Sequence, residues 1–274
     1  MKSDEMPRVI VGTNALSYET LCDEVDTMAS SADVLAIDCA PSYRSEDKIG
    51  KAVRRNMETY GTPRSKFFLQ TKLDEVDQLA GRVEQAFERS LSRMQVEYLD
   101  SYLMHWPCPS TFVNDWHTMV RLKRSGRVRH IGVCNFRMRH WRKLIDSHPE
   151  ELPEINQIEV HPLNTCNEML DYCRSIGVSV QAYTSLGKML PPISKNPQLE
   201  QMSAKYGCSI SELVLAWHVC RGVAPITKSS KPLRLKQNLC SALSITITDE
   251  DMETITSLNR NYRFFLESTG CPGF

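Results

Sequence analysis

The chain has no long apolar run and no excess of charge of either sign. No stretch reaches 18 consecutive apolar residues, the length at which a membrane-spanning helix would be considered. Lys plus Arg total 33 and Asp plus Glu total 33, so the formal net charge is zero. This balance gives no electrostatic basis for binding nucleic acid or a membrane surface, and we expect neither as a partner.

Cysteine pairs at the spacing of metal or redox sites are also missing. The ten cysteines are scattered, no Cys-x-x-Cys pair occurs, and only Cys166 and Cys173 lie within seven residues of each other. No metal site is therefore predicted. The first seven residues have no apolar core of the kind found in secretory signals. We expect reduced thiols and a cytoplasmic location.

Glycine-rich phosphate loops are a third absence. Neither Gly-x-Gly nor a P-loop pattern occurs, although a doubly wound sheet that bound a dinucleotide would normally carry such a turn. Short apolar runs instead alternate with helical stretches. The runs interpreted as strands are 34–37, 67–69, 98–104, 131–133, 155–158, 178–182, 223–226 and 239–243.

Helical periodicity fills the gaps between these runs. Residues 79–94 place their apolar side chains on one helical face, and 113–123, 167–176 and 210–220 behave similarly. Eight strand–helix units in about 250 residues predict a (β/α)8 barrel, or TIM barrel, forming one domain over 1–274. We interpret 8–13 as a short extra N-terminal strand or hairpin at the barrel floor.

Polar side chains recur where the apolar runs end, and several of the intervals are close to one strand–helix unit. In a barrel these side chains would converge on the carboxyl-terminal mouth, where this fold places active sites. The recurrence of polar residues at the ends of these runs therefore predicts an active site at the mouth. The residues are Asp38, Lys72, His105, Asn135, Gln157, Tyr183 and Lys228.

Four of the predicted mouth residues combine into one chemical hypothesis. An ammonium at Lys72 beside the phenol of Tyr43 is expected to lower the tyrosine pKa, while Asp38 keeps Lys72 charged. His105 would orient a carbonyl oxygen or share in proton transfer. Such a tyrosine is a general acid for an oxygen that gains negative charge, as when a carbonyl receives hydride. Taken singly, Asp38 and Lys72 would fit a structural ion pair, and His105 a core histidine.

A second cluster is suited to anions. Pro232 is a plausible first helical residue, which puts Lys228 and Ser229 beside a helix N-terminus. Arg234 and Asn238 are four residues apart and share a helix face. The cluster predicts a pocket for a phosphomonoester such as the 2′-phosphate of NADP, with a solvated basic patch as the alternative.

These residues stand in motifs that together resemble the aldo-keto reductases over residues 8–260. None of the motifs is specific alone, but their order along the chain is. They are Asp-Cys-Ala-Pro-Ser-Tyr at 38–43, Thr-Lys at 71–72, Leu-Met-His-Trp-Pro at 103–107, Ile-Gly-Val-Cys-Asn-Phe at 131–136, Asn-Gln-Ile-Glu-Val-His-Pro at 156–162, Ala-Tyr at 182–183, and Ile-Thr-Lys-Ser at 226–229 with Arg234 and Asn238.

The resemblance implies a barrel that binds NADP(H) without a Rossmann domain. It implies a catalytic tetrad of Asp38, Tyr43, Lys72 and His105, with Tyr43 as proton donor. Asn14, Tyr43, His105 and Trp106 would face the substrate. The residues expected to bind the cofactor are Gly12, Thr13, Asp38, Cys134, Asn135, Gln157, Tyr183, Leu186, Lys228, Ser229, Arg234, Gln237 and Asn238.

The chain departs from the family pattern at five positions. Cys134 replaces a usual Ser, Asn14 a frequent Trp, Thr227 a usual Pro, and Gln237 an acidic residue that holds adenine. Thr184 begins a Thr-Ser-Leu-Gly segment where Ser-Pro-Leu-Gly is usual, so the loop that clasps the cofactor is expected to be set differently. A weaker hold on the carboxamide is expected from Cys134, because a thiol is a weak hydrogen-bond partner.

The resemblance predicts an oxidoreductase, acting on CH–OH donors, that reduces an aldehyde or ketone with NADPH. A small-molecule carbonyl compound is the expected partner, and the expected state is a monomer. One alternative is a non-catalytic NADP(H)-binding sensor or regulatory subunit of the same fold. Others are a metal-dependent hydrolase, or an aldolase that uses Lys72 as a Schiff base. The aromatic tail from 262 to 274 would either fold over the pocket or pack on the barrel base.

Overall fold

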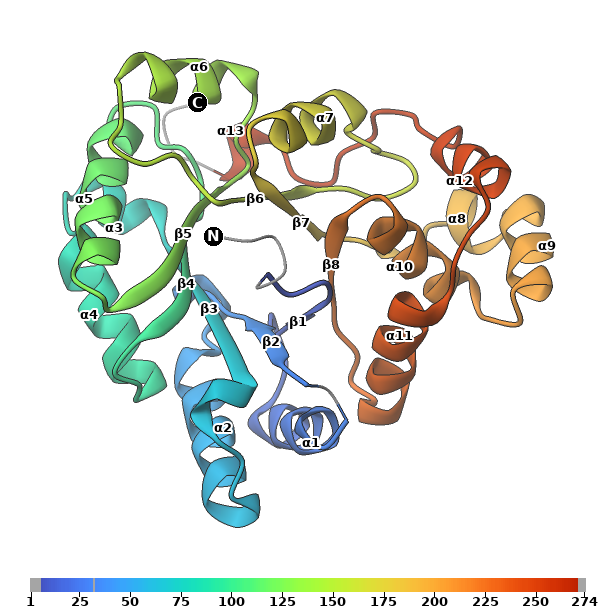
Figure 1. The fold of residues 1–274 in the computed structure, drawn as a ribbon, viewed down its shortest axis with the longest axis horizontal. Helices are drawn as coiled ribbons and strands as arrows, with labels where there is room; N and C mark the ends of the chain where they lie inside the picture. Colours follow the sequence, from blue (N-terminus) through green and yellow to red (C-terminus); the bar gives the residue numbers. More distant parts are fainter. Residues whose placement is uncertain (1–5, 32, 271–274) are drawn as a thin grey trace.

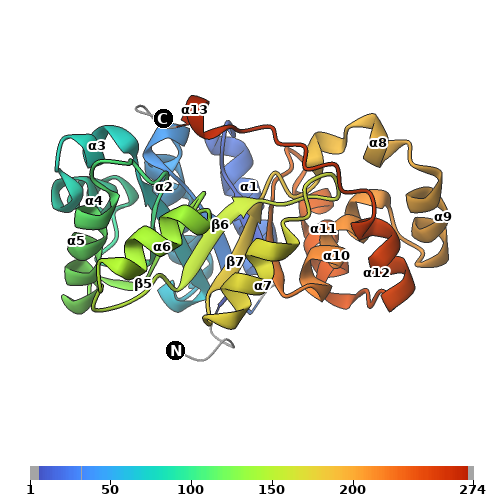
Figure 2. The same cartoon turned by 90° about the horizontal axis from the view of Figure 1, so that it is seen from above.

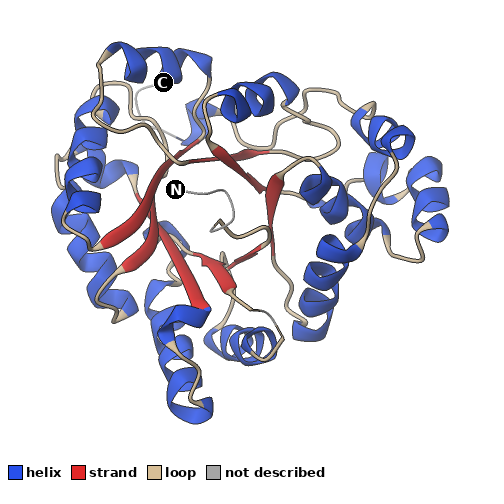
Figure 3. Ribbon diagram, in the orientation of Figure 1, coloured by secondary structure: helices blue, strands red, loops and turns tan. Residues whose placement is uncertain are grey.

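Eight parallel strands close into a barrel in the computed structural model, which describes residues 6–31 and 33–270 (Figures 1 and 3). Every strand pairs with its sequence neighbours, and β1 pairs with β8 to close the ring. The predicted (β/α)8 barrel is confirmed. The strands are β1 (Ile10–Gly12), β2 (Leu35–Asp38), β3 (Phe67–Leu73), β4 (Leu99–Met104), β5 (Val128–Cys134), β6 (Ile155–Glu159), β7 (Ser179–Tyr183) and β8 (Val223–Thr227).

Helices surround this barrel (Figures 2 and 3). The apolar core contains residues of both the strands and the helices. None of the helices in the described residues is long and apolar enough to cross a membrane. Nine cysteines lie in the described part, and no two of them form a disulfide. The helices are α1 (Tyr18–Ala29), α2 (Glu46–Tyr60), α3 (Glu75–Leu79), α4 (Val83–Met94), α5 (Phe112–Arg124), α6 (Met138–Asp146), α7 (Asn167–Ser175), α8 (Pro191–Ser194), α9 (Pro197–Lys205), α10 (Ile210–Cys220), α11 (Pro232–Ser244), α12 (Asp249–Thr256) and α13 (Glu267–Gly270), with 3₁₀ turns η2 (Pro41–Tyr43), η3 (Arg64–Lys66) and η4 (Gly187–Met189).

Two of the strand predictions were wrong, at opposite ends of the chain. The segment 8–13 is no extra element, because Ile10–Gly12 is β1 and lies between β2 and β8 in the barrel wall. The run 239–243 is not a strand but part of α11. The buried residues of α11 include Leu235, Leu239 and Ala242, and this spacing of four and three is helical.

The predicted helix 79–94 is broken in two. The structure ends α3 at Leu79, turns through Gly81 at φ 63°, and starts α4 at Val83. Leu79 is 47% exposed, so it does not belong to the buried face. That face is formed by Val83, Phe87 and Leu91 among others. The other three predicted helices match α5, α7 and α10 within one residue at either end.

Candidate active site

A pocket of about 560 Å³ opens at the carboxyl ends of the strands. Its wall includes most of the side chains predicted from the sequence, which confirms that the strand-end polar residues converge. Ser229, Arg234, Gln237 and Asn238 lie outside it, and Lys72 lies beneath its floor. The predicted residues that line it are Gly12, Thr13, Asn14, Asp38, Tyr43, His105, Trp106, Cys134, Asn135, Gln157, Tyr183, Leu186 and Lys228.

An ion pair forms the base of the pocket. Asp38 is the last residue of β2, and Lys72 lies near the end of β3, so the two side chains meet inside the barrel wall. The Lys72 Nζ lies 2.7 Å from both carboxylate oxygens and also donates to the Cys39 carbonyl at 3.0 Å. Burial would lower the pKa of Lys72, but Asp38 and Tyr43 outweigh it and raise that pKa. Lys72 is therefore an ammonium ion.

Three glutamines fill the barrel interior around this pair. The Asp38 Oδ1 accepts from Gln70 Nε2 at 2.7 Å and from Gln157 Nε2 at 3.1 Å. Gln181 accepts from both glutamines and donates back to Gln70. Neither Gln70 nor Gln181 was predicted from the sequence as a site residue. An amide inside the apolar run 178–182 was the available signal, because an interior strand position rarely carries an unpaired polar group.

Tyr43 stands above the ion pair. The turn η2 delivers it to the mouth, and Arg44 follows in the left-handed region at φ 53°. The Lys72 Nζ lies 4.6 Å from the centre of its ring. Burial raises the pKa of the phenol above its ordinary value, and Lys72 offsets this only in part. The expected net lowering of the Tyr43 pKa was wrong: the free site holds a neutral phenol, which still has a proton to give.

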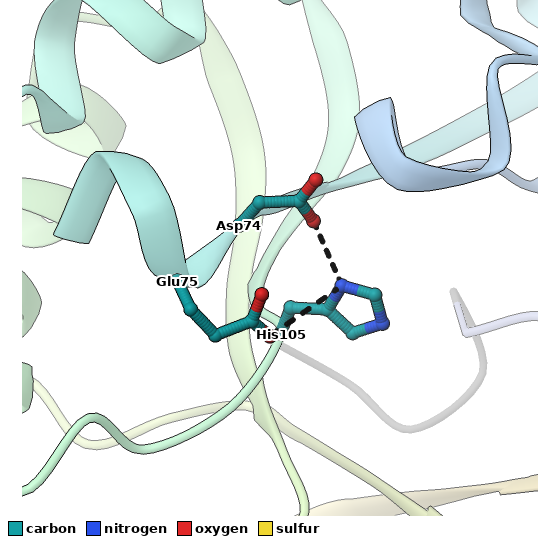
Figure 4. Close-up of side chains that lie close together, drawn as sticks. All are labelled: Asp74, Glu75 and His105. Atoms are coloured by element: carbon teal, nitrogen blue, oxygen red, sulfur yellow. Dashed lines mark hydrogen bonds and ion pairs between the residues drawn. The ribbon is translucent and has the colours of Figure 1, made fainter. Parts of the chain in front are cut away.

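His105 follows β4 and is flanked by two acidic residues that the sequence analysis missed (Figure 4). The Nδ1 lies 2.8 Å from Asp74 Oδ1 and 4.0 Å from Glu75 Oε1. The Tyr43 ring meets the imidazole edge-on, with 5.7 Å between ring centres. In the sequence, the Asp-Glu pair directly after the strand that carries Lys72 could have indicated these two residues. Because the hydrogen bond to Nδ1 accounts for this arrangement, we assign the acidic pair to the histidine, and the absence of a metal stays a prediction.

Two amides and a phenol shape the opposite wall. Asn135 adopts φ 62°, donates from Nδ2 to the His105 carbonyl at 3.0 Å, and accepts from the Tyr183 hydroxyl at 2.8 Å. Gln157 spends its Nε2 on Asp38 and Gln181, which leaves its Oε1 as an acceptor. Beside them, burial raises the pKa of the Cys134 thiol above its ordinary value. A donor and an acceptor side by side fit a primary carboxamide.

The loop after β7 begins at Thr184, one of the departures from the family pattern. Thr184 has φ 51°, a left-handed conformation that is rare for a β-branched residue. Ser185 then anchors the loop by donating to the Ile226 carbonyl at 2.8 Å, and His218 Nε2 lies 2.9 Å from the Ser185 carbonyl. This anchoring brings Leu186 to the pocket wall.

The predicted anion cluster is only partly assembled. Pro232 is the first residue of α11, as expected, and Lys228 Nζ donates to the Asn14 carbonyl at 2.6 Å. Arg234 is exposed and Asn238 is buried, so the two differ in surroundings although both lie on α11. Gln237 is exposed as well, and the Ser229 hydroxyl accepts from the Lys231 N–H at 3.1 Å.

A buried acid lies behind this cluster. Glu24 on α1 is 2% exposed, and burial raises its pKa to about 8, although the Ser229 N–H and the Lys228 ammonium pull it down. Glu24 was not predicted from the sequence as a site residue. In the sequence, an acidic residue among the apolar positions of the α1 helix could have indicated a buried acid.

The aromatic tail folds over the pocket rather than onto the barrel base. The Glu159 carboxylate at the end of β6 accepts from the N–H groups of Phe264 and Phe265 at 2.7 and 3.0 Å. Phe265 lines the pocket and meets the Tyr183 ring edge-on. Phe274 lies outside the described residues.

Known proteins share this sequence pattern and this architecture. The family model described as the aldo/keto reductase family matches residues 8–260. A glyoxal reductase from Bacillus subtilis is 33% identical over 83% of this chain and 80% of its own length. The methylglyoxal reductase DkgA from Salmonella typhimurium is 30% identical over 94% and 91%. The crystal structure of a Bombyx mori aldo-keto reductase in complex with NADP superposes with a TM-score of 0.88 at 28% identity, covering 96% of this chain and 92% of that one. The chain belongs to the aldo/keto reductase family.

Proposed function

We propose that the chain reduces an aldehyde or ketone to an alcohol with NADPH, and that Tyr43 is the proton donor. The observation that carries this assignment is the neutral phenol of Tyr43, held over the Lys72 ammonium at the mouth of the pocket. When bound, NADPH supplies a hydride from nicotinamide C4 to the carbonyl carbon. Tyr43 gives its hydroxyl proton to the carbonyl oxygen, which takes the C=O electron pair. Lys72 stabilises the phenolate that remains, and water then returns a proton to it.

The cofactor would lie across the pocket with its ends at different strands. Asn135 and Gln157 offer a donor and an acceptor to the carboxamide, and Tyr183 offers its ring face to the nicotinamide. Gly12, Thr13, Cys134 and Leu186 lie close by. The 2′-phosphate end would meet the α11 N-terminus. The residues assigned to that end are Lys228, Ser229, Arg234, Gln237 and Asn238.

The substrate would enter between Asn14, Trp106 and the tail residue Phe265, all of which line the pocket. The relatives named glyoxal reductase and methylglyoxal reductase make small dicarbonyl compounds the first substrates to test. Cysteines without disulfides in the described part support a reducing compartment such as the cytoplasm. The monomeric state stays a prediction.

The rival functions receive less support from the site. An aldolase needs a neutral amine at Lys72, whereas Asp38 holds that side chain as a buried ammonium. A non-catalytic sensor has no use for a complete set of Asp38, Tyr43, Lys72 and His105 around one pocket. Catalysis is the function that this set supports best.

One experiment separates these readings. NADPH and NADH are titrated by protein fluorescence, and reduction of 4-nitrobenzaldehyde and methylglyoxal is followed in the same samples. We expect binding of NADPH with turnover, and a loss of at least a hundredfold in kcat for Tyr43→Phe with unchanged NADPH affinity. Nearly full activity in Tyr43→Phe would overturn the proton-donor assignment. Binding of NADPH without turnover of either substrate would favour the sensor.

A further inference from the structure

Asp74 does not make the hydrogen bonds that are usual for an aspartate at its position in the chain. It is the N-cap residue of α3, where an aspartate normally accepts from backbone N–H groups of the first helical turn. Its side chain makes no capping hydrogen bond. The carboxylate turns instead to the imidazole of His105, with 2.8 Å between Asp74 Oδ1 and Nδ1 (Figure 4). The same oxygen lies 3.3 Å from the hydroxyl of Ser42, the residue before Tyr43.

This contact decides which ring nitrogen of His105 carries the proton. An ionised carboxylate can only accept, so Nδ1 must be the donor. In the neutral ring Nε2 then has a lone pair and no proton. Nε2 points away from both carboxylates (Figure 4), and His105 lines the pocket. A carbonyl oxygen is also only an acceptor, so a neutral His105 held in this way cannot donate to it.

The charged and titratable groups around the ring come from four elements. Asp74 and Glu75 lie at the β3–α3 junction, and Tyr43 faces the ring edge from η2. Burial raises the pKa of Glu75, although His105 opposes that shift. On β5, Cys134 is a buried thiol with a raised pKa. Lys72 on β3 lies under Tyr43 and is paired with Asp38.

We propose that Asp74 is a positioning residue that fixes the Nδ1–H form of His105, so that His105 donates a hydrogen bond to the substrate oxygen only as an imidazolium ion. The imidazolium keeps its proton throughout. Hydride goes to the carbonyl carbon and the proton comes from Tyr43. The proposal rests on the proposed reductase function, and it adds a pH dependence to the reaction that a neutral Nε2–H histidine would not give.

The first test reads the tautomer without any turnover. Long-range ¹H–¹⁵N spectra of ¹⁵N-labelled protein are recorded across pH, with the His105 signals assigned by their loss in His105→Gln. We expect the neutral ring of the wild type to show Nδ1–H, and Asp74→Leu to show Nε2–H or a mixture. An Nε2–H ring in the wild type would overturn the proposal whether or not the protein proves to be a reductase.

The second test follows kcat and KM for methylglyoxal at saturating NADPH from pH 5 to 9. In Asp74→Asn we expect kcat to fall about tenfold near neutral pH and the pH profile of kcat to change shape relative to the wild type. The affinity for NADPH should not change. Asp77→Asn is the matched control, because Asp77 lies on the same helix but pairs with Arg82 and Arg89 on the surface. A pH profile of Asp74→Asn that superimposes on the wild type would contradict the proposal.

Discussion

The two ends of the proposed cofactor site are built in different ways. At the barrel mouth each side chain comes from a different strand, and the side chains bind one another: Asp38 with Lys72 and Gln157, and Asn135 with Tyr183. At the other end they come from the single segment 228–238, and Arg234 and Gln237 face solvent. Strand ends thus fix the chemical half of the proposed site without a ligand, whereas the proposed phosphate half has two of its side chains exposed and would be completed by the anion.

The largest effect on this difference between the two ends is expected from removing Lys72, the cation at the base of the pocket. Lys72→Met leaves Asp38 buried without its counter-ion, and we expect the free energy of unfolding to fall by about 3–5 kcal/mol. Activity should fall by at least a hundredfold. Urea unfolding and kcat measure the two effects. The double variant Lys72→Met/Asp38→Leu should regain much of the stability but none of the activity. Wild-type stability in Lys72→Met would mean that Asp38 is not held by this charge.

The second prediction concerns the buried acid behind the phosphate segment. The pKa of Glu24 is raised to about 8 in the folded chain, against about 4.3 when unfolded. The folded state therefore binds the proton more tightly, and stability is lost as pH rises from about 4.3 to about 8. Glu24→Gln removes that loss, so we expect it to stabilise the protein by about 4–5 kcal/mol at pH 8 and by only about 1 kcal/mol at pH 5.

Thermal unfolding at the two pH values measures the Glu24 effect. Asp23→Asn is the control, since Asp23 is the exposed neighbour of Glu24 on the same helix. An equal change in Tm for Glu24→Gln at both pH values would show that Glu24 does not titrate in this range. A gain confined to alkaline pH would show that Glu24, behind the phosphate segment, differs from the acid at the barrel mouth. That acid, Asp38, is paired with the Lys72 ammonium at 2.7 Å.

The smallest effect is expected at the exposed end. Arg234→Ala should weaken NADPH binding about tenfold, the value of one charge-assisted contact to phosphate. Binding of NADH should not change, because NADH has no 2′-phosphate. Fluorescence titration with both nucleotides measures the ratio, and Lys236→Ala on the same helix is the control. An equal loss for both nucleotides would place Arg234 at another part of the cofactor.

Much of the fold could be predicted because seven strands have apolar runs that are bounded by polar strand ends. The run 239–243 failed because five apolar or small residues in a row fit a strand and a buried helix turn equally well. The segment 8–13 that contains β1 was taken for an extra strand because eight other runs, 239–243 among them, had already been assigned to the barrel. Nothing local distinguishes a barrel strand from a strand that plugs the floor.

The candidate site was predictable at the residues that end strands and was incomplete behind them. Gln70 and Gln181 meet across 111 positions of sequence, a pairing that only strand order in the closed barrel determines. Asp74 was missed because an aspartate after a strand and before a helix fits an N-cap. The raised pKa of Tyr43 depended on how much protein buries it, which sequence spacing does not state.

The pairing of β1 with β8 has a consequence for how the protein is made. Thr227 in β8 pairs with Val11 in β1, and the next residue, Lys228, reaches the Asn14 carbonyl over 214 positions. Within the barrel, β1 is therefore made before the other seven strands, and the ring can close only after β8 has been made. Contacts of such sequence separation form late and slowly. A nascent chain that lacks β8 does not have the pocket. The proposed cofactor can therefore bind and stabilise only chains in which β1 and β8 have paired.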